Sequence, residues 1–421
     1  MSNNVLIIGC GIAGPVLALL LKAKGFNPIV FEKVRQLGDV GASLMLMPNG
    51  MKVLDLVGVA TDIYASSFPL EAYEDFDYSG ELLGSSALPA GFEKRYGQRA
   101  TGVKRTALNI TLANRLKDSG IELRQGWELS GIQEDASSIT ASFTNGEKVQ
   151  GSFLVGCDGI KGSSRSCLLA LKDRDDTKPT FTGLSQTSGL SRVPGPLEVS
   201  SMRNWYGEGV HVIAYPVSRD FISWAVTLPQ TDESPESWRL YKDDAMQKLK
   251  DELSRDVLGG FEPGVVQMVL CAERLLKFGL FDRRTLEAEE WYSARCVLVG
   301  DAAHPTSPHL GQGANQALED CYHLSKSLPD SDRWSLATDP PLRSLESIFE
   351  EYARKRQPRT SALVKGARAA GEKRVVTTGR KDCEARDKRV AAEWQDTEGI
   401  SAKFDNLCKE PFLLMPLRQH S

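Results

Sequence analysis

A glycine-rich turn near the start of the chain, Gly9-x-Gly11-x-x-Gly14, constrains the fold more than any other feature. It lies between a short apolar run at residues 5–8 and a helical apolar stripe over about residues 12–24. A strand, a glycine turn and a helix in this order predict a parallel sheet with a right-handed crossover. In such a turn the first glycine permits the bend, the second lets a pyrophosphate approach the backbone, and the third lets the helix pack closely on the strand.

A carboxylate at the end of the next predicted strand narrows the choice of dinucleotide. The apolar run Pro28–Glu32 ends in Glu32, which lies 18 residues after Gly14. At this place a carboxylate can accept a hydrogen bond from a ribose 2′-hydroxyl. The same charge repels a 2′-phosphate, so the site favours bound FAD or NAD over NADP. The helix N-terminus adds a partial positive charge that faces the phosphates.

The pair Asp158-Gly159 follows a second predicted buried strand, at residues 153–157. Asp-Gly is a turn signal, so the pair by itself fits an ordinary turn as well as a binding site.

The third motif, Gly300-Asp301, is the most informative. It follows a predicted strand at residues 296–299, and Gly313-Ala314 lie at the start of a predicted helix over about residues 312–327. Asp301, at a strand end, can hold a ribityl or ribose hydroxyl group. The small residues let a ligand lie on the backbone, and the helix N-terminus can stabilise negative charge on a reduced flavin ring.

Charge and cysteine usage exclude several classes of protein. The net charge of −4, without a polybasic run, argues against a nucleic-acid partner. The eight cysteines are scattered without a CxxC pair, so we expect no metal site and no disulfide framework. Free thiols favour a reducing, cytoplasmic location. No stretch provides the roughly 20 apolar residues of a membrane span, so no integral membrane segment is expected.

With these motifs in this order and spacing, the chain resembles the class A FAD-dependent monooxygenases, the aromatic-ring hydroxylases related to salicylate hydroxylase and fungal enzymes of secondary metabolism. The resemblance extends to about Gly371 and includes Glu351-Tyr352 and residues 356–359, which are similar to the helix after the family's substrate domain. Gly162 departs from the family, in which many members have serine, and this affects the expected nicotinamide contacts.

The resemblance implies which residues contact FAD. Glu32 would bind the adenosine ribose, Asp301 the ribityl or pyrophosphate region, and Asp158 both FAD and the nicotinamide. The complete predicted set is Gly9, Gly11, Gly14, Glu32, Gly41, Ala42, Arg105, Asp158, Asp301, Gly313 and Ala314.

The predicted fold class is α/β. We expect a Rossmann-like FAD-binding domain, an inserted and mostly antiparallel β substrate domain, and a C-terminal helical region. The predicted ranges are 1–175 and 286–330 for the two parts of the FAD-binding domain, 176–285 for the substrate domain, and 331–421 for the C-terminal helices and charged tail. Within the substrate domain, residues 265–271 are expected to be extended.

The resemblance also implies the reaction. NAD(P)H and O2 would be co-substrates, and a flavin C4a-hydroperoxide would hydroxylate or epoxidise a small aromatic, indole, polyketide or terpenoid substrate. A base that deprotonates a phenol raises the nucleophilicity of the ring. His211 and Tyr215 are the candidate catalytic residues, because strand alternation places them on one face, and His309 is a third candidate beside the flavin loop. For each of the three, a core or surface role without chemistry is the favoured interpretation. Four aromatic residues of the insert could line a pocket or fill the sheet core: Trp205, Tyr206, Phe221 and Trp224.

Two other functions remain open at the level of sequence. An FAD-dependent oxidase or dehydrogenase could use the same fold. A non-catalytic flavin-binding redox module could use Lys381–Glu398, which we interpret as a solvated helix, as a docking segment. Substrate identity, NADH or NADPH preference and oligomeric state are not determined, and a homodimer is one candidate.

Overall fold

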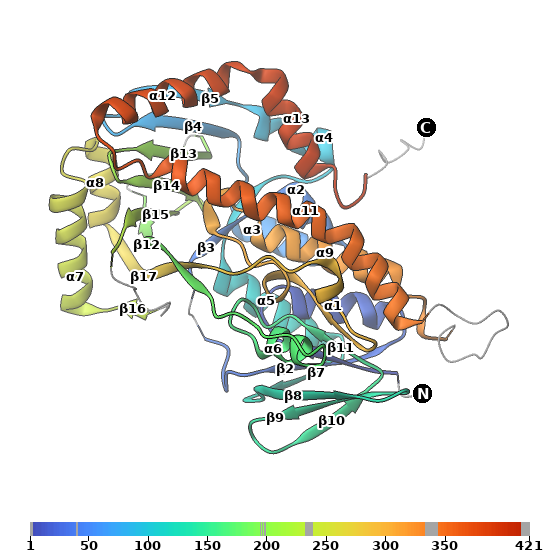
Figure 1. The fold of residues 1–421 in the computed structure, drawn as a ribbon. Helices are drawn as coiled ribbons and strands as arrows, with labels where there is room; N and C mark the ends of the chain where they lie inside the picture. Colours follow the sequence, from blue (N-terminus) through green and yellow to red (C-terminus); the bar gives the residue numbers. More distant parts are fainter. Residues whose placement is uncertain are drawn as a thin grey trace, which may run out of the picture.

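The computed structural model describes residues 3–413 except 39–40, 194, 196, 198, 232–238 and 333–343. Figure 1 shows a parallel sheet covered by helices at one end of the molecule and a large second sheet at the other. The C-terminal helices run along both parts. The predicted α/β class is confirmed.

The parallel sheet has the order β18-β11-β1-β2-β7, and every neighbouring pair in it is parallel. Its strands are β1 (Asn4–Ile8), β2 (Asn27–Glu32), β7 (Glu122–Gln125), β11 (Phe153–Gly156) and β18 (Cys296–Leu298). The strands that precede the three motifs therefore lie side by side, because β1 is followed by the first motif, β11 by the second and β18 by the third. The carboxyl ends of parallel strands share one edge, so the motifs meet there.

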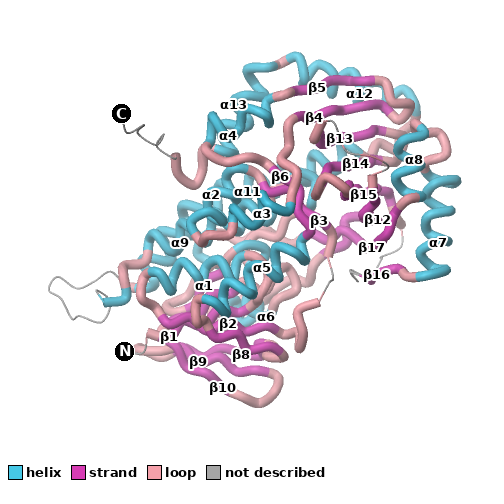
Figure 2. The backbone as a smooth tube through the Cα atoms, turned by 180° about the vertical axis from the view of Figure 1, so that it is seen from behind, coloured by secondary structure: helices cyan, strands magenta, loops and turns pink. Residues whose placement is uncertain are grey.

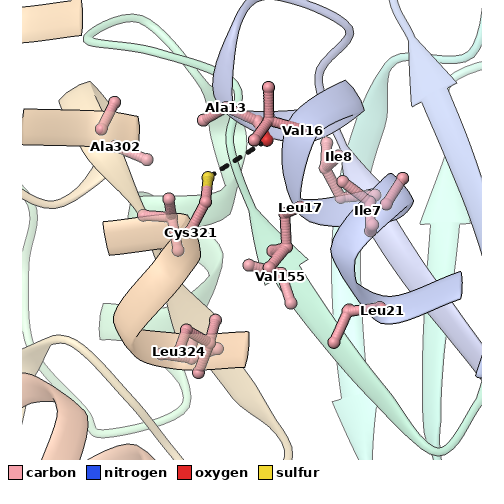
Figure 3. Packing of buried hydrophobic residues seen from close by; sticks show 14 of the residues in the cluster. Ile7, Ile8, Ala13, Val16, Leu17, Leu21, Val155, Ala302, Cys321 and Leu324 are labelled. Atoms are coloured by element: carbon pink, nitrogen blue, oxygen red, sulfur yellow. Dashed lines mark hydrogen bonds between the residues drawn. The ribbon is translucent and has the colours of Figure 1, made fainter. Parts of the chain in front are cut away.

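The helices beside this sheet are α1 (Ala13–Ala23), α5 (Arg105–Asp118), α6 (Ser163–Ala170) and α9 (Gly313–Ser327). Figure 3 shows Leu17 of α1 and Leu324 of α9 packed in the same apolar layer as Val155 of β11. The thiol of Cys321 lies 3.3 Å from the carbonyl oxygen of Ala13, so α9 packs directly on the start of α1. Burial thus fixes the middle of α9 against the start of α1.

A three-stranded antiparallel sheet adjoins the parallel one. It contains β8 (Leu129–Glu134), β9 (Ile139–Phe143) and β10 (Lys148–Gly151). The hairpin between β9 and β10 turns at Gly146, whose φ of +88° favours glycine.

The second large sheet has the order β16-β17-β12-β15-β14-β13-β4-β5, and its pairs are antiparallel except for β4 with β13. Two of its strands, β4 and β5, come from the predicted range 1–175, which therefore supplies strands to both large sheets. The strands are β4 (Ala72–Asp77), β5 (Leu82–Ser86), β12 (Thr180–Arg192), β13 (Ser201–Tyr206), β14 (His211–Pro216), β15 (Phe221–Pro229), β16 (Arg239–Tyr241) and β17 (Ala272–Asp282).

One predicted element is wrong. Residues 265–271 were expected to be extended, but Pro263–Leu270 form helix α8, with Pro263 at its first turn, where proline is favoured. Helices α8 and α7 (Asp243–Glu252) cover one face of the second sheet, where Val265 and Leu249 pack in a buried cluster with Val226.

The C-terminal region forms α11 (Leu345–Arg374), α12 (Arg380–Gln395) and α13 (Thr397–Cys408), and α12 packs against β5. Figure 2 shows α12 and α13 beside β4 and β5 from behind. The interpretation of Lys381–Glu398 as a solvated helix is therefore wrong for one face, because α12 buries Cys383, Arg386 and Val390. The ammonium group of Lys52 fastens its end by donating to the carbonyl oxygens of Cys408 at 2.8 Å and Phe412 at 2.8 Å.

The remaining elements are β3 (Ser43–Leu46), β6 (Thr101–Lys104), α2 (Pro48–Leu56), α3 (Ala60–Ser66), α4 (Phe92–Tyr96), η1 (Leu88–Gly91), η2 (Leu253–Val257), η3 (Ala288–Glu290), η4 (Gly300–Ala302) and η5 (Pro308–Leu310).

Candidate active site

A cavity of about 1330 Å³ lies between the three motifs and the second sheet. It is larger than the roughly 300–1,000 Å³ of a site for one drug-sized ligand. One end is lined by the motif residues Gly11, Asp158 and Asp301, and the other by β13 and the C-terminal helices. The volume therefore suits a dinucleotide and a second small molecule together.

The glycines of the first motif have the geometry that the sequence predicts. A Cβ on Gly14 would lie 2.0 Å from the carbonyl oxygen of Gly9, so only glycine lets α1 pack this closely. Gly9 has a φ of +106°, and a Cβ there would lie 2.5 Å from the carbonyl oxygen of Cys157. A Cβ on Gly11 would meet nothing within 4 Å, and Gly11 lines the cavity. The backbone at Gly11 is thus open to a ligand.

Glu32 lies at the end of β2 and is bound to the first motif. Its Oε2 accepts from the amide of Cys10 at 2.8 Å, and its Oε1 accepts from the amide of Val34 at 3.0 Å. Each carboxylate oxygen can accept a second bond, so the side chain keeps capacity for a hydroxyl group. Lys33, and not Glu32, is among the residues that line the cavity.

Asp158 places a buried carboxylate at the same edge. Its Oδ2 accepts from the amide and the hydroxyl of Ser164, both at 2.9 Å. Its Oδ1 is buried and has no hydrogen-bond partner in the described structure. Burial raises the pKa of Asp158. Many members of the family that the sequence resembles have serine at the position of Gly162. In this chain a side chain there is excluded sterically, because a Cβ would lie 2.0 Å from the carboxyl carbon of Asp158.

The third motif brings Asp301 and the start of α9 together. A Cβ on Gly313 would lie 3.8 Å from Oδ1 of Asp301, and Gly313 and Ala314 both line the cavity. Asp320 holds the turn from behind, because its Oδ2 accepts from the amide of Gly300 at 2.9 Å. The motif is therefore fastened to the middle of α9.

A buried charge cluster extends this support to α11. The guanidinium of Arg356 lies 2.6 Å from Asp320 and 2.6 Å from Glu319, and all three side chains are at most 1% exposed. The Nε2 atom of His304 also lies 2.5 Å from Asp320. Although burial opposes ionisation, His304 and Arg356 lower the pKa of Asp320 to about 2.

Ala42 and Arg105 line the same cavity, and Gly41 packs against Arg105 in its wall. The amide of Arg105 donates to the carbonyl oxygen of Ala42 at 3.3 Å, and a Cβ on Gly41 would lie 3.4 Å from the Arg105 side chain. Asn315 of α9 fixes the strand that follows, because its Nδ2 donates to the carbonyl oxygen of Met45 at 3.0 Å. The structure thus brings ten of the eleven predicted FAD residues to the cavity or to the packing of its walls, and Glu32 to a position beside it.

These features fit FAD. The open backbone at Gly11 faces the N-terminus of α1, as a pyrophosphate requires. The unpartnered Oδ1 of Asp158 can accept from a hydroxyl or N–H group of the cofactor. The glycine and alanine at the start of α9 leave room for a flat ring against the helix N-terminus.

The two candidate catalytic residues differ in access. Tyr215 lines the cavity, and burial raises the pKa of its hydroxyl. His211 is 1% exposed and is not among the lining residues; its Nε2 lies 3.1 Å from Oδ1 of Asn204. Burial lowers the pKa of His211 well below its usual range. His309 lines the cavity, and burial lowers its pKa to about 4.

The predicted aromatic residues divide between wall and core. Tyr206 and Trp224 line the cavity. Trp205 stacks on Phe76 in the cluster beneath α7 and α8, and Phe221 lies against the cations of Lys104 and Arg192.

Sequence reasoning missed a group of residues at the far end of the cavity. Asp75 comes from β4, Arg374 from the last turn of α11, and Trp394 and Phe404 from the charged tail. A signal for the tail existed, since Cys383, Arg386, Val390 and Trp394 recur at helical spacing. No comparable signal marked Asp75.

Among the described residues there is no cluster of three or more His, Cys, Asp or Glu side chains able to hold a metal ion. Over the same residues, no helix is both long and apolar enough to cross a bilayer.

Comparisons with known proteins agree with this geometry. A family model described as an FAD binding domain matches residues 2–367. The chain is 29% identical over 352 residues to 3-amino-4-hydroxybenzoate 2-monooxygenase PtnB3 of Streptomyces platensis, covering 82% of this chain and 83% of the relative. It is 25% identical over 378 residues to 3-hydroxybenzoate 6-hydroxylase of Polaromonas naphthalenivorans, covering 88% and 89%. The structure of Klebsiella pneumoniae HpxO complexed with FAD and uric acid matches with a TM-score of 0.81 and 24% identity, covering 97% of each chain.

Proposed function

The chain belongs to the family that shares this FAD binding domain and is an FAD-dependent monooxygenase, and we propose that it inserts oxygen into a small aromatic substrate with NAD(P)H and O2 as co-substrates. The observation that supports this most strongly is the convergence of three distant glycine motifs on one end of a cavity whose other end is lined by aromatic and apolar side chains. The names of the relatives, which act on hydroxylated or aminated benzoates, favour an aromatic ring.

We propose these roles for the residues that would hold FAD. The amides around Gly11 and the N-terminus of α1 bind the pyrophosphate, and Glu32 accepts from the adenosine ribose. Asp301 accepts from the ribityl chain, and Asp158 accepts through its free Oδ1. The backbone at Gly313 and Ala314, with Gly41, Ala42 and Arg105, borders the ring system.

FAD held by these residues would supply the redox chemistry, with the nicotinamide as hydride donor and O2 as the oxidant. The overall balance is substrate, O2, NAD(P)H and a proton giving hydroxylated substrate, water and NAD(P)+. The protein orients the ring of the substrate and excludes water from it. Tyr215 can donate to or accept from a substrate hydroxyl at the cavity wall. His211 acts, in this proposal, through Asn204 and not by touching the substrate.

We also propose that residues 1–175 and 286–330 form the FAD-binding part. Residues 176–285, together with β4 and β5, form the substrate part, and residues 331–421 form a C-terminal region that covers both. The eight free cysteines support a cytoplasmic location.

Purified protein tests the proposal. We expect tightly bound FAD, NADH or NADPH oxidation stimulated by an aromatic substrate, and product that carries label from 18O2. An oxidase or dehydrogenase instead gives unlabelled product, with peroxide if O2 accepts the electrons, and either result would refute oxygen insertion.

Asp301→Ala supplies the site-specific test. We expect FAD to be lost from this variant, whereas Asp256→Ala, at an exposed residue of η2 outside the cavity lining, retains it. Retention of FAD by Asp301→Ala at wild-type affinity contradicts the proposed role.

A further inference from the structure

Asp75 is a buried carboxylate in the wall of the cavity, opposite the end where the FAD motifs lie. It belongs to β4, is 6% exposed and is a lining residue. None of the three FAD motifs contains it, and β4 belongs to the second sheet. Its position instead faces the space left for a substrate.

Three donors hold the Asp75 carboxylate in place. Oδ1 accepts from Nδ2 of Asn204 at 2.7 Å, and Oδ2 accepts from Nε1 of Trp394 at 2.8 Å and the hydroxyl of Tyr206 at 3.3 Å. A carboxylate oxygen can accept two bonds, so Oδ1 has capacity for one more. The orientation is fixed while one acceptor position remains for a ligand.

Within the described part of the chain, the charge of Asp75 is buried without a cation in direct contact with it. Among the described residues it forms no ion pair within 4.0 Å, so burial of its charge is costly. The three neutral donors offset only part of this cost. A further donor, supplied by a ligand to the remaining acceptor position of Oδ1, would offset more of it.

Arg374 is a cation in the same wall. It ends α11, lines the cavity and donates from Nη1 to the carbonyl oxygen of His309 at 2.5 Å. Its charge acts on Asp75, yet the described structure contains no ion pair between the two. Neighbouring cations are engaged: Lys373 pairs with Glu393 and Arg359 with Glu319. An acidic and a basic group thus share a wall without neutralising each other directly.

We propose that Asp75 and Arg374 form a two-point recognition site for an aromatic substrate that bears both an anionic group and an amino or hydroxyl donor. Arg374 binds the anion, Asp75 accepts from the donor, and the rings of Tyr73 and Phe404 pack on the substrate. This inference rests on the proposed function and specifies the substrate class for the same site.

Calorimetric titration of the FAD-loaded protein with three probes tests it. The probes are 3-aminobenzoate, with both groups, benzoate, with the anion alone, and 3-aminobenzamide, with the donor and no anion. The wild type should bind 3-aminobenzoate at least about tenfold more tightly than either other probe. Asp75→Asn should abolish the preference over benzoate, and Arg374→Met the preference over 3-aminobenzamide.

Matched variants separate recognition from support. Glu74→Gln on the same strand and Arg354→Met on the same helix alter exposed ion pairs and should keep both preferences. Trp394→Phe removes a donor to Asp75 but keeps its charge, so it should keep the preference for 3-aminobenzoate over benzoate.

Three results would overturn the inference: no preference or no binding in the wild type, an unchanged preference in Asp75→Asn, or equal losses for all probes in Asp75→Asn and Trp394→Phe. The last result would mean that Asp75 supports the fold and does not recognise the ligand. Failure of the proposed function is distinguishable, because it appears as absent 18O incorporation with the binding preferences intact.

Discussion

Replacing Arg356 by methionine should destabilise the protein strongly, because it removes the buried cation between α9 and α11. The guanidinium contacts Asp320 and Glu319 at 2.6 Å each, and its Nη2 donates to Oε1 of Gln316 at 2.8 Å. Methionine fills a similar volume without the charge, so the loss is electrostatic and not a cavity.

The size of the destabilisation follows from the partners that Glu319 and Asp320 keep in Arg356→Met. Glu319 keeps Arg359 at 2.9 Å, but among the described residues Asp320 keeps only His304 and the amide of Gly300. Removing one partner of a buried ion pair costs about 3–5 kcal/mol. Total stabilities are about 5–15 kcal/mol, so this is a large fraction. Because Asp320 also holds the Gly300 turn, FAD affinity should fall as well.

Urea denaturation followed by tryptophan fluorescence measures the change in the free energy of unfolding. Arg354→Met is the matched control, because this residue is 74% exposed and pairs with Glu350 on the same helix. It should cost no more than about 0.5 kcal/mol. Arg356→Lys keeps the charge, so its loss in free energy of unfolding should lie between those of the other two variants. It can be measured even if Arg356→Met does not fold. A loss below about 1 kcal/mol in Arg356→Met would refute the reasoning.

Two further predictions concern pH and the first motif. Burial lowers the pKa of His309 and of His323 to about 4, below the usual value near 6.5. Between these two pH values the unfolded chain therefore binds more protons than the folded protein. The free energy of unfolding should fall as pH drops from about 6.5 to 4. Urea denaturation across that range should show a shallower slope for His323→Gln, and an unchanged slope contradicts the assignment. Gly14→Ala should lower the free energy of unfolding of the apoprotein by about 1–3 kcal/mol, because the added Cβ meets the Gly9 carbonyl. Gly11→Ala should change the stability of the apoprotein by no more than about 0.5 kcal/mol but should weaken FAD binding. Equal effects of the two alanines on the apoprotein would contradict this steric explanation.

The parallel sheet and the cofactor motifs could be predicted from sequence because their signals are local. A strand, a turn glycine and a helix follow one another within some 20 residues, and the steric roles of Gly9 and Gly14 need only near neighbours. The run at 265–271 was predicted wrongly because a short apolar segment fits a strand or a helix, and Pro263 was the deciding residue.

The substrate end of the cavity could not be predicted because its residues meet only through tertiary contacts. Asp75 lies beside Asn204, 129 positions away in sequence, and is bonded to Trp394 across 319 positions. The high charge of the tail concealed its packing role, because α12 buries Arg386 with Val390 and so lacks a clean apolar stripe. Periodicity detects a buried face but does not identify what covers it.

The position of β18 at the edge of the parallel sheet has a consequence for synthesis on the ribosome. While residues up to about 290 are emerging, β1 and β11 can already pair, but the edge of β11 that receives β18 stays open to other chains. Gly313 and the stabilising Arg356 emerge later still. FAD can therefore bind only after most of the chain has been synthesised. Truncated chains released before β18 is made should aggregate and should not bind FAD.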